Sequence, residues 1–230
     1  MIWLAVSFVG LIAKVIRETK KKTALWVGGL FLFYSGLIAW FWLEAGNKAF
    51  GSGEPGLMGW FIIGSVLFLI GELLPVLQEE TASWALAAWG LAAGAFALGF
   101  DIFRPDDYSY VPGAILGVLT LLVALQAYFS LSTGIKKSAG FDRVLLAIYI
   151  FAITALVYAA IAKSIDRGWA LPWAYMASGG ALLFAAGQAW MGWEDILKKK
   201  VAAPWVQVAA INVGQLMMVV AAFFVYKEFL

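Results

Sequence analysis

The chain has 230 residues, of which 63% are hydrophobic and only 13% charged, whereas a soluble domain keeps roughly a quarter of its residues charged, so the outer surface must face lipid. The 16 basic and 14 acidic residues leave a net charge of +2, which gives no electrostatic reason to expect a nucleic-acid partner. Cysteine and histidine are both absent, which excludes disulfides, thiolate nucleophiles, histidine-bound metals and Ser-His-Asp catalysis, and we expect no cofactor and no metal.

Eight apolar stretches follow one another along the chain, and helices are expected because backbone polar groups in lipid must be satisfied within each segment. Glycine and proline separate them, as at Gly51–Gly56, Pro112 and Pro204. No linker divides the chain, so residues 1–230 are predicted to be a single transmembrane domain: an all-α, polytopic membrane helix bundle of about eight transmembrane helices. The predicted helices cover residues 2–16, 24–43, 57–77, 82–100, 113–133, 144–163, 172–192 and 205–226.

The first stretch, residues 2–16, is short for a membrane span and resembles the apolar region of a signal peptide. However, no basic residue precedes it, no small-residue cleavage site follows it, and a basic cluster (Lys20–Lys22) comes after it. These features favour a retained helix over a signal peptide.

Basic residues of the loops alternate between the two sides that eight helices would define. One side receives eleven: Lys14, Arg17, Lys20, Lys21, Lys22, Lys136, Lys137, Arg143, Lys198, Lys199 and Lys200. The other side receives five: Lys48, Arg104, Lys163, Arg167 and Lys227. Because cytoplasmic loops carry an excess of Lys and Arg, both termini are predicted on the non-cytoplasmic side.

Glu72 is the acidic residue that falls clearly inside a predicted span, and an ionisable group in hydrocarbon is a functional-site hypothesis by default. The alternative is that Glu72 is protonated or reaches water from its place near the end of the third helix. Gln188 follows Gly187 in a Phe-x-x-Gly-polar pattern that repeats the pattern ending at Glu72. Both helices run in the same direction, which suggests two parallel halves with facing polar positions.

Further polar side chains within the spans have two readings. They could line a cavity with Glu72 and Gln188, or they could hold helices together through interhelical hydrogen bonds, which is the commoner role. These candidates are Gln126, Tyr149, Tyr158, Asn212 and Gln215. Glycine pairs at 28–29, 90/94 and 179–180 indicate close helix contacts, and no lysine suited to a retinal Schiff base is expected inside a span.

Several of these motifs together resemble a known family, the lysoplasmalogenase-like (YhhN-type) eight-helix membrane proteins. Thr19–Thr23 is similar to the family's basic segment before its second helix, and Phe68–Leu74 resembles its Gly-Asp motif with Glu in place of Asp. Tyr149 matches a tyrosine early in helix six, Ala181–Gln188 resembles a Leu-Phe-x-x-Ser-Asp stretch, and Gly214–Leu216 resembles Ala-Gln-Leu in helix eight. The resemblance implies an eight-helix fold and an active site built from polar positions on these helices.

The chain departs from this family at two positions that the resemblance would make catalytic. Gln188 stands where the family has an aspartate, and the family's histidine in helix four aligns near Ala93. The family hydrolyses the vinyl-ether bond of lysoplasmalogens, which requires an acid and a base. Glu72 could supply one of them, but the amide of Gln188 cannot titrate to supply the other.

These substitutions favour a non-catalytic multi-pass membrane protein that binds lipid or serves as an accessory subunit of a membrane protein complex. Membrane lipids and other membrane subunits are then the expected partners. Two alternatives remain: a lysoplasmalogenase-like hydrolase in which Glu72 is the catalytic residue, and a small transporter that uses Glu72 for proton coupling.

Overall fold

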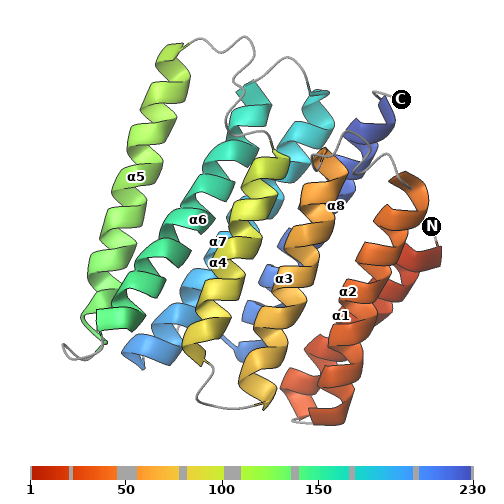
Figure 1. Cartoon of the computed structure of the whole chain (residues 1–230), viewed down its shortest axis with the longest axis horizontal. Coiled ribbons are helices and arrows are strands. Elements are labelled where there is room, and N and C mark those ends of the chain that lie inside the picture. The colour runs from red at the N-terminus through yellow and green to blue at the C-terminus, as the bar shows by residue number, and fades with distance from the viewer. Residues whose placement is uncertain are drawn as a thin grey trace.

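The computed structural model describes residues 2–20, 23–45, 56–77, 82–100, 110–135, 140–165, 169–198 and 202–228. Within these ranges the chain forms eight α-helices and no strand, which confirms the predicted all-α bundle (Figure 1). The helices are α1 (Ile2–Lys20), α2 (Thr23–Ala45), α3 (Leu57–Leu77), α4 (Ala82–Gly99), α5 (Tyr110–Ser132), α6 (Gly140–Ile165), α7 (Leu171–Leu197) and α8 (Pro204–Glu228).

The predicted and observed helix boundaries agree most closely where glycine or proline bounds the apolar run. Helix α3 covers the predicted residues 57–77, and α8 begins at Pro204, one residue before the prediction. The largest differences are extensions into polar sequence: α1 continues to Lys20, α6 begins at Gly140, and α7 continues to Leu197. After α7, Lys198 adopts a left-handed conformation and donates its backbone N–H to the Trp193 carbonyl. A helix can continue beyond its apolar side chains, because the headgroup region and water accommodate polar side chains on a helix as well as in a loop.

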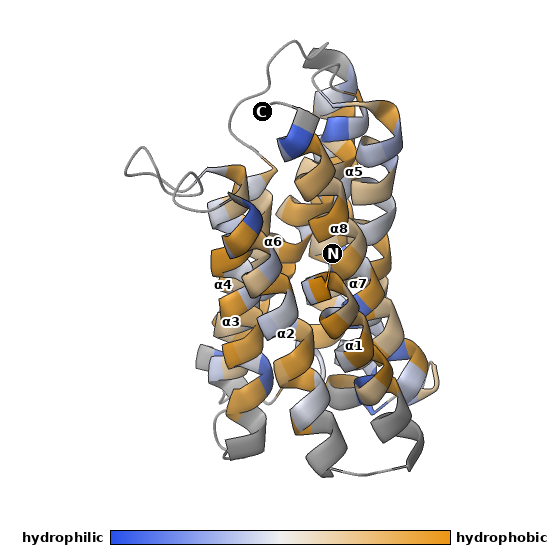
Figure 2. Cartoon of the chain, turned by 90° about the vertical axis from the view of Figure 1, so that its right-hand side faces the viewer, coloured by the Kyte–Doolittle hydropathy of each residue, from blue (hydrophilic) through white to orange (hydrophobic). Residues whose placement is uncertain are grey.

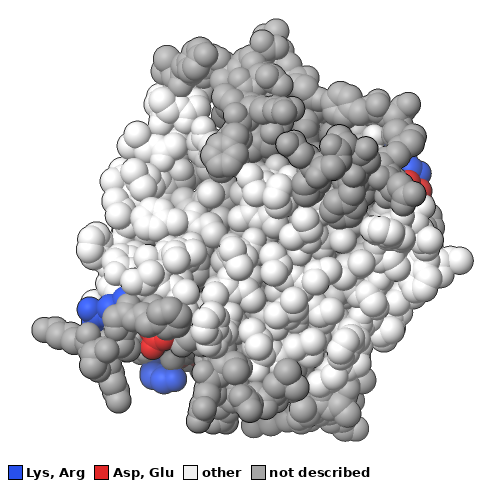
Figure 3. Space-filling view, viewed as in Figure 1, with Lys and Arg blue, Asp and Glu red and all other residues white. Residues whose placement is uncertain are grey.

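Five of the eight helices are long and apolar enough, within the described ranges, to cross a membrane: Val27–Glu44, Leu57–Leu74, Pro112–Ser132, Asp142–Ile165 and Pro204–Lys227. Helices α1 and α4 contain shorter apolar stretches, Ile2–Val15 and Trp84–Gly99. Figure 2 shows hydrophobic residues along the full length of the helices, and on the face in Figure 3 the described charged residues lie at the two ends of the molecule. The uncharged surface between these ends is the surface expected to face lipid.

Successive helices run in opposite directions, and helices that follow one another in the chain lie side by side in several pairs (Figure 1). Helix α1 packs on α2, α3 on α4, and α7 on α8, while α8 also reaches α1 and α3. Helix α5 lies at the opposite edge of the bundle from α1 and α2, and it packs mainly on α6, with few contacts to α7. The two sides of the bundle therefore differ: the helices α1, α3 and α8 are closely packed, whereas α5 is not closely packed on the rest of the bundle.

Small residues allow the closest helix crossings. A Cβ added at Gly180 of α7 would lie 2.7 Å from the Gly214 carbonyl oxygen of α8, and one at Gly29 of α2 would lie 2.8 Å from the Gly10 carbonyl oxygen of α1. The predicted contact role is therefore right for Gly29 and Gly180. It is wrong for Gly28 and Gly94, where an added Cβ would meet nothing within 4 Å, because these glycines point away from neighbouring helices.

Aromatic rings fill the centre of the main core. Trp40 packs on Phe223 with ring centroids 4.3 Å apart, and Phe61 packs edge-on to Phe100 at 5.1 Å. A separate, smaller core holds α5 to α6 through Ala124, Leu131, Leu146 and Ile150. Few buried side chains thus attach α5, which leaves space between it and the rest of the bundle.

Candidate functional site

A buried ion pair joins α1 to α3. Lys14 Nζ lies 2.7 Å from Glu72 Oε2 and 2.9 Å from Glu72 Oε1, and the two side chains are only 2% and 15% exposed. The prediction that Lys14 is a loop charge is wrong, because Lys14 lies within α1 and the bundle encloses its ammonium group. A charge can be buried in this way only when an opposite charge and hydrogen bonds compensate for lost hydration.

Neutral side chains from two more helices complete this cluster. Tyr34 of α2 donates its hydroxyl hydrogen to Glu72 Oε1 over 2.8 Å, and Asn212 Oδ1 of α8 accepts from Lys14 Nζ over 2.8 Å. The Tyr34 hydroxyl also lies 3.1 Å from Gln215 Oε1. We call Lys14, Tyr34, Glu72, Asn212 and Gln215 the ion-pair cluster. It ties α1, α2, α3 and α8 together at one level of the bundle.

The ion-pair cluster is suited to holding helices together. The two charges cancel, and both carboxylate oxygens of Glu72 accept hydrogen bonds from Lys14. Neither Lys14 nor Glu72 lines the cavity on the other side of the bundle.

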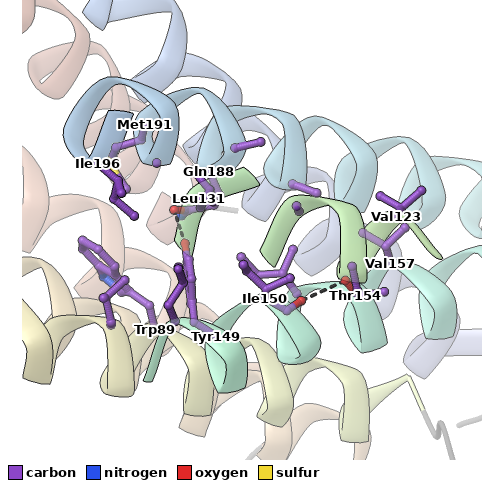
Figure 4. Close-up of a pocket in the computed structure, with 18 of the residues that line it drawn as sticks. Trp89, Val123, Leu131, Tyr149, Ile150, Thr154, Val157, Gln188, Met191 and Ile196 are labelled. Carbon is purple, nitrogen blue, oxygen red and sulfur yellow. Dashed lines mark hydrogen bonds between the residues drawn. The ribbon is translucent and has the colours of Figure 1, made fainter. Parts of the chain in front are cut away.

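That cavity has a volume of about 710 Å³ and lies between α4, α5, α6 and α7 (Figure 4). Its walls consist mostly of alanine, leucine, isoleucine and valine side chains. Asp142, Ile135 and Ile196 line its end nearest the α5–α6 turn, and Leu119, Val157 and Ile161 line the other end. The cavity thus runs along the helices across most of the apolar region. We call it the α5 cavity.

One polar pair interrupts the apolar wall. The Tyr149 hydroxyl of α6 donates a short hydrogen bond to Gln188 Oε1 of α7, and the two residues are 7% and 5% exposed (Figure 4). The threonines that line the cavity turn their hydroxyls to their own helices: Thr120 donates to the Leu116 carbonyl and Thr154 to the Ile150 carbonyl. The Tyr149–Gln188 pair is therefore the main polar feature within the walls.

Trp89 of α4 stands between the α5 cavity and helix α3. Its indole lines the cavity, its ring centroid lies 6.3 Å from that of Tyr149, and a Cβ added at Gly71 would lie 2.5 Å from its Nε1. Gly71 precedes Glu72, so the absence of a side chain at residue 71 lets the indole fit against α3. The ion-pair cluster and the cavity consequently lie on different sides of α3.

The structure divides the sequence-predicted site residues into two groups. Glu72, Asn212 and Gln215 meet in the ion-pair cluster, whereas Tyr149 and Gln188 meet in the α5 cavity. Gln126 belongs to neither group, because it is exposed on α5 and does not line the cavity. The repeated pattern does bring Phe68 and Phe184 together, with ring centroids 5.3 Å apart, but the polar residues one turn later point to different neighbours.

Lys14 and Tyr34 are the residues that sequence reasoning missed. A signal existed for Lys14, since it is an ionisable residue inside the predicted helix 2–16. None existed for Tyr34, because its role depends on which helix faces it. Among the described residues, no group of three or more acidic side chains gathers to hold a metal ion.

Comparison of the chain with models of known protein families, with curated proteins and with solved structures gives no match.

Proposed function

We propose that this chain is a non-catalytic, multi-pass membrane protein that binds the apolar chain of a lipid in the α5 cavity. The observation that carries the proposal is the cavity of about 710 Å³ with its apolar walls. Ligand sites in proteins are typically concave, mostly apolar and roughly 300–1,000 Å³ in volume, with few polar groups. In a membrane, a lipid chain is the abundant molecule with this shape and chemistry.

The position of the cavity supports entry from the bilayer. Helix α5 forms its outer wall, and the opposite face of α5 exposes Val118, Leu122 and Phe129. Because α5 is held mainly by its contacts with α6, a lipid chain can pass from the bilayer to the cavity beside one helix. Helices that pack on a single neighbour open at low cost compared with those buried in a core.

The chemistry of the cavity supports binding without catalysis. Gln188 is a neutral amide, and Glu72 is paired with Lys14 on the other side of α3. Vinyl-ether hydrolysis needs one group to donate a proton and another to activate water. Asp142 is the one carboxylate among the described residues that line the cavity, and it lies at the end near the α5–α6 turn.

Photo-crosslinking tests the proposal. Purified protein in micelles is illuminated with a lysophosphatidylcholine that carries a diazirine in its acyl chain, and the labelled peptides are mapped by mass spectrometry. We expect labels on the facing walls of α5, α6 and α7. Ala127→Phe, which fills the cavity from α5, should reduce labelling several-fold. Ala114→Phe places the same ring on the exposed side of the same helix and is the matched control.

Two results would contradict the proposal. Labelling that is confined to the outer face of α5, or that Ala127→Phe does not reduce, would show that the cavity does not hold the chain. Aldehyde release from a lysoplasmalogen by the purified wild-type protein would instead favour the hydrolase alternative.

A further inference from the structure

The side-chain nitrogen of Gln188 is an unused hydrogen-bond donor in the wall of the α5 cavity. The Gln188 oxygen accepts a hydrogen bond from the Tyr149 hydroxyl, but the Gln188 nitrogen donates a hydrogen bond to no described residue. An amide nitrogen carries two hydrogens, and a donor left unpaired away from water is costly. A group that can accept a hydrogen bond is therefore expected in the cavity beside it.

We infer that the ligand of the α5 cavity is a lipid with an uncharged ester carbonyl, and that Gln188 Nε2 donates a hydrogen bond to this carbonyl oxygen. The inference rests on the proposed function, because it concerns the same cavity, and it adds the chemical group that the cavity recognises.

Tyr149 sets the direction of the amide. Its single hydroxyl hydrogen goes to the Gln188 oxygen, which leaves the nitrogen end as the donor available to a ligand. Tyr149 is itself held in place: its ring lies against Trp89, and its backbone packs closely on Gly90 of α4, where an added Cβ would lie 3.4 Å from the Tyr149 Cα. Tyr149 is thus a positioning residue for Gln188.

At the level of Gln188, the cavity wall does not favour a charged group of a ligand. No basic residue is among the described residues that line the cavity, so nothing there compensates for a buried carboxylate. The Gln188 nitrogen cannot accept a hydrogen bond, so it cannot bind an ammonium group. A neutral acceptor is the chemistry that fits.

The depth of Gln188 fits an ester that joins a chain to a head group. Gln188 lies eight residues before Ile196 on α7, which corresponds to roughly 12 Å along the helix from the cavity end that Ile196 and Asp142 line. A head group at that end leaves its ester within reach of Gln188 and its chain among the apolar walls.

A matched pair of competitors tests the inference. Lysophosphatidylcholine and its 1-O-alkyl ether analogue of equal chain length share the chain, the glycerol and the head group, and only the first has an ester carbonyl. Each is titrated against the crosslinking probe in the wild-type protein. We expect lysophosphatidylcholine to compete ~5-fold more strongly, the ratio that one net hydrogen bond gives. Gln188→Leu should bring this ratio close to one, and Tyr149→Phe should reduce it in part.

Gln126→Leu is the control, because it removes the same amide from an exposed position on α5 that does not line the cavity, and it should leave the ratio unchanged. A second measurement needs no variant: the infrared band of a ¹³C-labelled ester carbonyl should move to lower wavenumber when the lipid binds the wild-type protein.

The outcomes separate the inference from the proposed function. If both competitors displace the probe equally and the carbonyl band does not move, the inference is wrong while the cavity still binds a chain. If neither competitor displaces the probe, the proposed function fails together with the inference.

Discussion

Glu72→Gln should destabilise the protein strongly, because it removes one charge of a buried pair and leaves the other. Lys14 would keep its ammonium group at 2% exposure, facing an amide in place of the carboxylate that now lies 2.7 Å away. Breaking a buried ion pair by removing one partner costs roughly 3–5 kcal/mol. Because Glu72 is 15% exposed and the pair is not fully enclosed, we expect the lower end of this range, ~3 kcal/mol.

The double variant Lys14→Met/Glu72→Gln isolates the pair. Removing both charges leaves no unpaired ion, so its free energy of unfolding should return to within about 1 kcal/mol of the wild type. The measurement is unfolding by sodium dodecyl sulfate in mixed micelles, followed by circular dichroism and tryptophan fluorescence. Glu44→Gln is the matched control: Glu44 pairs with Lys227 over 3.5 Å at 35% and 52% exposure, and such surface pairs contribute about 1 kcal/mol or less. A Glu72→Gln protein as stable as wild type, or a double variant less stable than both single variants, would refute the reasoning.

Three further predictions concern close contacts and topology. Gly180→Ala should lower the free energy of unfolding by about 1–3 kcal/mol, since its Cβ would press on the Gly214 carbonyl. Gly28→Ala should leave the free energy of unfolding unchanged, because its Cβ would meet nothing within 4 Å. Unfolding in detergent compares the two variants. Gly71→Ala should push the Trp89 indole toward the α5 cavity and weaken crosslinking by the lipid probe, without loss of folded protein in size-exclusion chromatography. A reporter that fluoresces only in the cytoplasm, fused after residue 230, should stay dark, because ten basic residues in or near one set of helix ends still face five at the other set when Lys14 is left out; a bright fusion would overturn the predicted orientation.

The helices were predictable from sequence because lipid imposes one rule along the whole chain. The apolar run bounded by helix breakers predicted both end residues of α3 correctly, since a segment in hydrocarbon must form its backbone hydrogen bonds within itself. The ends of α1 and α7 were less predictable, because in the interfacial region a polar residue fits a helix as well as a loop.

The partners of the site residues were not predictable from one sequence. Glu72 and Gln188 were recognisable as polar groups in spans, but the pairing of Glu72 with Lys14 joins residues 58 positions apart. Such a contact depends on which helices are neighbours and how each is rotated. The same holds for Gln126, which resembles Gln188 in sequence context and yet faces outward, because α5 has neighbours on one side only.

The separation of Lys14 from Glu72 along the chain also has a consequence for biosynthesis. A ribosome adds roughly 5–20 residues per second, so α1 emerges several seconds before the carboxylate that will neutralise its lysine. Asn212 follows 198 residues after Lys14 and is made later still. During that interval the long lysine side chain must extend to the nearest membrane surface. Helix α1 therefore reaches its final depth only once α3 has been inserted.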